Sequence, residues 1–107
     1  MNTVLLTGRL TRDPEMRTVA NGRTVTTTCV VTEAEEVAGN DGPDNEYHTI
    51  VGWDILAEQM AIHLHAGDLV HVTGTMRTRT WEDERGIRHY KPECIVQRIL
   101  IIKGVLS

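Results

Sequence analysis

Apolar and β-branched residues occur in short runs along this chain, and several of these runs alternate with polar residues. Alternation with a period of two is the pattern of a strand that buries one face. The pattern therefore predicts five strands, which cover residues 4–10, 23–32, 46–53, 68–81 and 93–102.

One segment has a helical period instead. Leu56, Met60 and Leu64 recur at every fourth position within residues 54–64. Asp54 is placed to cap the start of this helix, and Gly67 follows its end. Before the third strand, residues 34–45 are acidic and rich in glycine, which predicts a loop.

Five strands with one helix between the third and the fourth predict an all-β fold, namely a five-stranded Greek-key barrel of the oligonucleotide-binding (OB) type. The helix would close the open end of the barrel. A sandwich with one additional helix is the alternative. The chain has 107 residues, which is enough for a single domain over residues 1–107.

Residues 76–91 predict an extended β-hairpin ribbon that could bind a nucleic-acid strand. Arg77, Arg79 and Trp81 alternate and so share one face, and Arg88 and Lys91 return after an acidic turn. Cations contact phosphates, and an indole stacks on any base. The alternative is an exposed hairpin that charge keeps soluble.

The net charge of −4 argues against such binding only if the total alone is considered. Residues 33–46 hold six acidic residues and no lysine or arginine, so the charge is segregated along the chain. A local basic surface is compatible with an acidic total. In the first 25 residues Arg9 lies on a strand and is the best candidate for a phosphate contact, whereas Arg12, Arg17 and Arg23 are solvated by default.

Other chemistry finds no support in the sequence. There is no glycine-rich phosphate loop and no nucleophile motif, so we expect neither an enzyme nor a cofactor. His63, His65 and His71 lack the spacing of a metal site. Cys29 and Cys94 lie in apolar runs, as reduced buried thiols do. No apolar run is long enough to span a membrane and no signal peptide is evident, so we expect a cytoplasmic protein.

Several short motifs, in order and at compatible spacing over nearly the whole chain, resemble the bacterial single-stranded DNA-binding protein family. They are Gly8-Arg9-Leu10, Asp13-Pro14-Glu15, Asn21-Gly22, Glu46-Tyr47-His48, Leu56-Ala57-Glu58 and Arg77-Thr78-Arg79-Thr80-Trp81. The resemblance implies an OB fold, usually a homotetramer with a dimer as the alternative. It also implies a nucleoid protein that wraps single-stranded DNA without sequence preference in replication, recombination and repair.

The resemblance also assigns residues. Tyr47, Trp53 and Trp81 match the family's stacking aromatics, and Arg77 and Arg79 match the basic residues before the last of them. His48 matches a histidine that is often tied to the subunit interface.

The chain departs from the family in three ways. A stacking aromatic is missing where residues 32–36 lie, there is no phenylalanine, and the acidic tail that recruits replication and repair enzymes does not follow the last strand. We therefore expect single-stranded DNA binding without tail-mediated recruitment. The alternative is an interaction or primosome-like adaptor subunit on the same fold, which has no need for a basic and aromatic ribbon.

Overall fold

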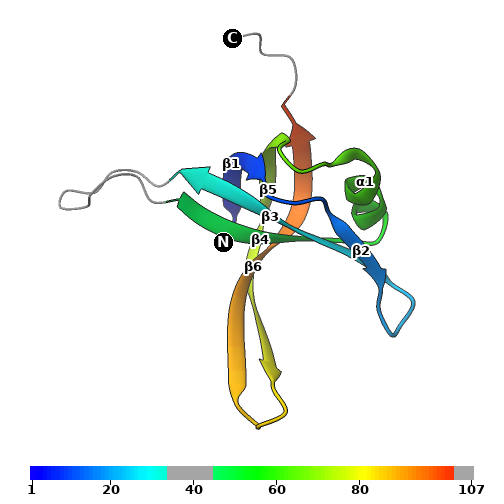
Figure 1. The fold of residues 1–107 in the computed structure, drawn as a ribbon, viewed down its shortest axis with the longest axis vertical. Helices are drawn as coiled ribbons and strands as arrows, with labels where there is room; N and C mark the ends of the chain where they lie inside the picture. The colour runs from blue at the N-terminus through cyan, green and yellow to red at the C-terminus, as the bar shows by residue number, and fades with distance from the viewer. Residues whose placement is uncertain (34–44, 103–107) are drawn as a thin grey trace, which may run out of the picture.

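The computed structural model describes residues 1–33 and 45–102. It contains six strands and one helix (Figure 1). In chain order these are β1 (Val4–Leu10), β2 (Glu15–Thr18), β3 (Thr24–Glu33), β4 (Asn45–Trp53), α1 (Ile55–His63), β5 (Leu69–Glu82) and β6 (Arg88–Ile101).

The strands form one curved sheet that closes on itself. Their order is β1-β5-β6-β4-β3-β2, and a further pairing of β1 with β3 completes the barrel. Neighbouring strands are antiparallel except β4 and β6, which pair in parallel at Ile50↔Cys94 and Val51↔Ile95. With one helix between β4 and β5, the architecture confirms the predicted OB fold.

Two details of the strand prediction were wrong. Residues 15–18 form the additional strand β2, because the turn at Asn21-Gly22 folds them back onto residues 24–27. Gly22 has a φ of 83°, which glycine adopts without strain. The ribbon's return segment and the predicted last strand are one continuous strand, β6, of 14 residues. Of the predicted loop 34–45, residues 34–44 lie outside the described part of the chain.

The core lies inside the barrel and is closed at one end by α1. Val30, Ile50, Val70 and Val72 are fully buried there, and Met60 of α1 packs into the same cluster. A side chain on Gly52 would collide with the sulfur atom of Met60, so the Met60 side chain would have to move where the helix packs on β4.

Asp54 does not cap α1 as predicted. Its side chain makes no hydrogen bond to the first turn of the helix, and its backbone has φ 59° and ψ −126°. A non-glycine residue rarely adopts a positive φ. The carboxylate is used elsewhere, in a contact that belongs to the candidate site.

Strands β5 and β6 continue beyond the barrel as a two-stranded ribbon that projects from the body (Figure 1). They stay paired as far as Glu82↔Arg88, and a turn with Gly86 at φ 77° connects them. No helix in the described residues is long and apolar enough to cross a membrane.

Candidate nucleic-acid interface

Strand register gathers three aromatic side chains and most of the candidate cations on the face of the sheet opposite to the core. Directly paired residues of neighbouring strands point to the same side, and that side alternates along each strand. The pairs Val25↔Trp53, Val31↔Tyr47 and Arg79↔Lys91 therefore place all their members on one face. We call this the outer face. Among its aromatic and basic members are Arg9, Arg17, Tyr47, Trp53, Arg77, Arg79, Trp81 and Lys91.

A hollow of about 300 Å³ lies on the outer face, where the base of the ribbon approaches β2, β3 and β4. We call it the groove. Buried Val25 and Val51 line it together with Thr27, and Trp53 lies beside them. Val19, four cations and two carboxylates complete the lining; the charged residues are Arg12, Arg17, Arg79 and Lys91, with Glu15 and Glu93. The apolar lining and the indole suit a nucleic-acid base, and the surrounding cations suit its phosphate.

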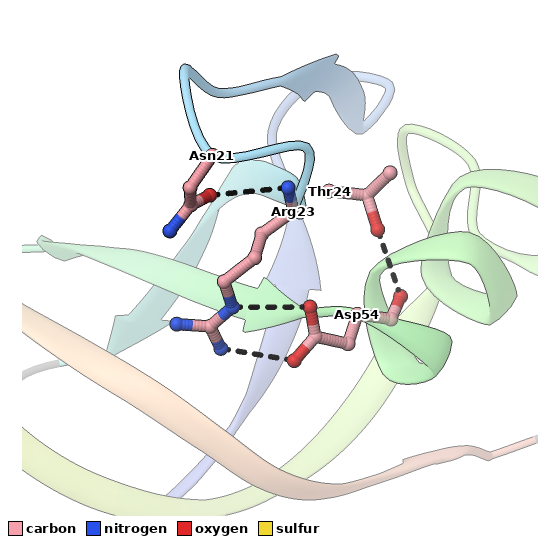
Figure 2. A network of polar contacts seen from close by, with 4 residues as sticks. All are labelled: Asn21, Arg23, Thr24 and Asp54. Carbon is pink, nitrogen blue, oxygen red and sulfur yellow. Dashed lines mark hydrogen bonds and ion pairs between the residues drawn. The ribbon is translucent and has the colours of Figure 1, made fainter.

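Trp53 lies at the end of β4 and carries a cation on its ring. The guanidinium carbon of Arg23 is 4.6 Å from the ring centroid. Arg23 is in turn held by Asp54, whose Oδ1 and Oδ2 accept hydrogen bonds from Nε and Nη2 at 3.2 and 2.9 Å (Figure 2). The hydrogen bond from Arg23 lowers the pKa of Asp54 below its ordinary value.

Trp81 has a similar environment on the ribbon. Arg79 lies over its ring at 4.4 Å, and the ring of His89 stacks beside it with centroids 5.3 Å apart. The Nε of Arg79 lies 3.3 Å from a carboxylate oxygen of Glu93, which is almost buried. Trp81 as a residue is 39% exposed, so part of its side chain is open to a base.

His89 is itself fixed by a carboxylate at the ribbon's turn. Its Nε2 lies 2.8 Å from Oδ2 of Asp83. That contact, and a hydrogen bond from the backbone amide of Ile87, lower the pKa of Asp83.

Tyr47 is the most exposed of the three aromatics, at 66%. It pairs with Val31, which in turn pairs with Arg9, so the three follow one another across the outer face. Arg9 lines a second hollow next to Thr32 and donates a hydrogen bond from Nη1 to the carbonyl oxygen of Gly67.

Arg88, which the sequence analysis grouped with Lys91 as a candidate contact on the ribbon, does not lie on the outer face. It pairs with Glu82, one position out of phase with Trp81↔His89, and therefore points to the other side of the ribbon. Tyr90 shares that opposite side and is 66% exposed. The reason is a spacing of three between Arg88 and Lys91, which separates their faces on a strand.

His48 points away from the outer face, because it alternates with Tyr47 along β4. Its Nε2 lies 2.9 Å from the hydroxyl oxygen of Thr32. A role of His48 at a subunit interface stays a prediction.

Sequence reasoning missed several members of this surface, among them Arg12, Arg17, Arg23 and His89. Arg17 reaches the groove because β2 exists and pairs Arg17 with Val25. His89 reaches Trp81 across the ribbon. The signal for Arg17 was present in the Asn21-Gly22 turn, which sets the hairpin register, whereas the His89 contact follows only from the pairing of β5 with β6.

Comparison of the sequence with known proteins identifies a family. Residues 1–102 match the model of the single-strand binding protein family. A protein of Caldanaerobacter subterraneus subsp. tengcongensis named single-stranded DNA-binding protein is 37% identical over 103 residues, which cover 96% of this chain and 69% of that protein. A protein of Lactiplantibacillus plantarum with the same name is 32% identical over 104 residues, covering 97% of this chain and 52% of that protein.

The chain therefore spans about two thirds of one of these relatives and about half of the other. The family that the sequence motifs indicated is confirmed. Its members are binding proteins, as the sequence analysis expected, and not enzymes. This chain belongs to the single-strand binding protein family.

Proposed function

We propose that this chain binds single-stranded DNA without sequence preference and protects exposed strands in replication, recombination and repair. One observation carries the proposal: strand register directs Tyr47, Trp53 and Trp81 to the outer face together with the cations around the groove. Every base has a π-face, so stacking on these rings requires no particular sequence.

The roles differ among the cations of the outer face. Arg77 and Lys91 on the ribbon, Arg9 on β1 and Arg17 on β2 are the proposed phosphate contacts. Arg79 lies between Glu93 and the Trp81 ring, so its charge is partly balanced before DNA arrives. With few unbalanced cations, we expect a moderate salt dependence of binding.

Assembly of several copies would compensate for the small number of contacts per chain. Linked sites on one strand raise the effective concentration of each further contact. We propose a homo-oligomer, with a tetramer favoured over a dimer and His48 near a subunit interface. The proposed setting is cytoplasmic and nucleoid-associated, with residues 1–107 acting as one OB domain.

Intrinsic tryptophan fluorescence during titration with a long oligo-dT strand tests the function. Stacking of bases on Trp53 and Trp81 should quench the emission, and the affinity should fall as salt rises. A folded oligomer that shows no quenching and no binding at low salt would contradict the proposal. That result would favour the adaptor hypothesis.

A further inference from the structure

Each tryptophan of the outer face carries an arginine on its ring, and a carboxylate holds each of these arginines. Arg23 lies 4.6 Å from the Trp53 ring centroid, and Arg79 lies 4.4 Å from that of Trp81. Asp54 holds Arg23, as Glu93 holds Arg79. The same arrangement arises from unrelated segments, since Arg23 follows the β2–β3 turn whereas Arg79 lies two residues before its own tryptophan.

The contact of Arg23 with Asp54 is the better defined of the two. It is bidentate, with hydrogen bonds of 3.2 and 2.9 Å to the two carboxylate oxygens (Figure 2). Two hydrogen bonds from a planar guanidinium fix the plane of the group as well as its position. Figure 2 shows the remaining terminal nitrogen of Arg23 pointing away from Asp54.

Hydrogen bonds of the neighbouring backbone also hold this pair in place. The amide of Asp54 donates to the carbonyl oxygen of Thr24 at 2.9 Å, and the hydroxyl of Thr24 donates back to the carbonyl oxygen of Asp54 at 3.2 Å. Asp54 keeps a φ of 59° that glycine would adopt more readily. Strained residues persist where surrounding contacts determine them, and they concentrate at functional sites.

We propose that Arg23 and Asp54 are positioning residues for DNA binding. Asp54 holds the Arg23 guanidinium against one face of the Trp53 indole, and the indole is thereby set to stack one base from the groove. This inference deepens the proposed function and rests on it. Arg23 acts through Trp53, and its charge, balanced by Asp54, adds little to phosphate attraction.

The competing explanation is that Arg23 is an ordinary phosphate contact. The two explanations predict opposite signs for Asp54→Asn. Loss of a negative charge beside a phosphate contact would strengthen binding. Loss of the group that positions Arg23 weakens it.

The experiment is titration of labelled oligo-dT with the full chain, followed by anisotropy at several salt concentrations. We expect Arg23→Ala, Asp54→Asn and Asp54→Gly each to weaken binding about threefold to tenfold, a part of the effect of one stacked base. The slope of log affinity against log salt should stay unchanged. Arg17→Ala, the comparison variant from the same hairpin, should reduce that slope by about 0.7, as one lost phosphate contact does for single strands.

Asp54→Gly separates positioning from folding. Glycine relieves the positive φ, and this gain offsets the loss of the half-exposed ion pair with Arg23. The variant should therefore be about as resistant to urea as the parent while it binds DNA more weakly. In a Trp53→Ala background, Arg23→Ala should have no further effect on affinity, because the residue through which Arg23 acts is gone.

A second measurement needs no DNA. In Trp81→Phe, Trp53 is the only indole, and Arg23→Ala should make its fluorescence more accessible to acrylamide. If the parent fails to bind oligo-dT, the proposed function fails, while this measurement still tests the contact itself. Tighter binding by Asp54→Asn, or a drop of about 0.7 in the salt slope for Arg23→Ala, would overturn the inference.

Discussion

Single residues on the outer face gain their roles from the groups around them. Trp81 contacts both Arg79 and His89, and a carboxylate holds each of these two residues, Glu93 and Asp83 respectively. A ring fixed in this way loses little side-chain freedom when a base stacks on it, and conformational entropy is a large cost of binding. The exposed 39% of Trp81 is therefore a preorganised platform.

Trp81→Ala should weaken binding to oligo-dT by about 1–3 kcal/mol, the usual contribution of one stacked base. The ribbon should stay folded because Trp81 is not part of the core cluster. Anisotropy of a labelled strand measures the affinity, and circular dichroism checks the fold. Trp81→Phe, which keeps an aromatic ring, should retain most of the affinity; an unchanged affinity in Trp81→Ala would remove Trp81 from the site.

Acid should destabilise the protein through Asp54. Its folded pKa is lowered by the hydrogen bond from Arg23, so the pair stabilises the fold above the unfolded pKa of about 4 and this contribution is lost as pH falls through the folded pKa. In urea unfolding at pH 7 and at about pH 3, Asp54→Asn should lose less stability on acidification than the parent. Equal losses in both proteins would show that the Asp54 pKa is not lowered.

At the scale of elements, the ribbon formed by β5 and β6 presents two chemically different faces. One face carries Arg77, Trp81 and Lys91, and the other carries Arg88 and Tyr90. A strand alternates its side chains strictly, so a difference of one residue decides which cation faces the groove. Only the first face is continuous with the groove, which Lys91 lines.

Lys91→Ala and Arg88→Ala form a matched pair on the same strand. Lys91→Ala should weaken oligo-dT binding and lower the salt slope by about 0.7, because one phosphate contact is lost. Arg88→Ala removes the same charge from the other side and should leave the slope unchanged. Equal reductions for the two variants would show that DNA contacts both faces of the ribbon.

At the scale of the whole molecule, an acidic chain carries a basic and aromatic face. The net charge is −4, yet the groove is lined by four cations and two carboxylates. The local electrostatic potential, and the contacts that a ligand can make, depend more on where the charges lie than on the net charge. The barrel also places the two cysteines differently, with half-buried Cys29 on the outer face opposite Thr49 and buried Cys94 in the core.

Cys29 therefore offers a natural probe of the proposed interface. At neutral pH a thiol reagent should modify Cys29 much faster than Cys94, whose burial raises its pKa and so reduces the reactive thiolate. Saturating oligo-dT should slow modification of Cys29, because DNA would cover the outer face. Mass spectrometry of the labelled peptides measures both rates. A Cys29 rate that is the same with and without DNA would place the strand elsewhere.

The sequence alone was sufficient for the main strands, the helix and the family, but not for β2. Alternation predicted the main strands, the spacing of Leu56, Met60 and Leu64 predicted α1, and the ordered motifs indicated the family that the comparisons confirm. These features are local, because the period of apolar residues, the turn residues and the short motifs each depend on only a few consecutive residues.

Tertiary structure alone decided which side chains meet. The pairing of β5 with β6 stacks His89 on Trp81, and no spacing within either strand indicates that contact. The contact of Arg23 with Asp54 joins residues 31 positions apart. The Asp54 carboxylate therefore binds Arg23 and does not cap α1, although its position before the helix predicted a cap. Contacts of this kind depend on register between distant strands, which no local pattern of residues encodes.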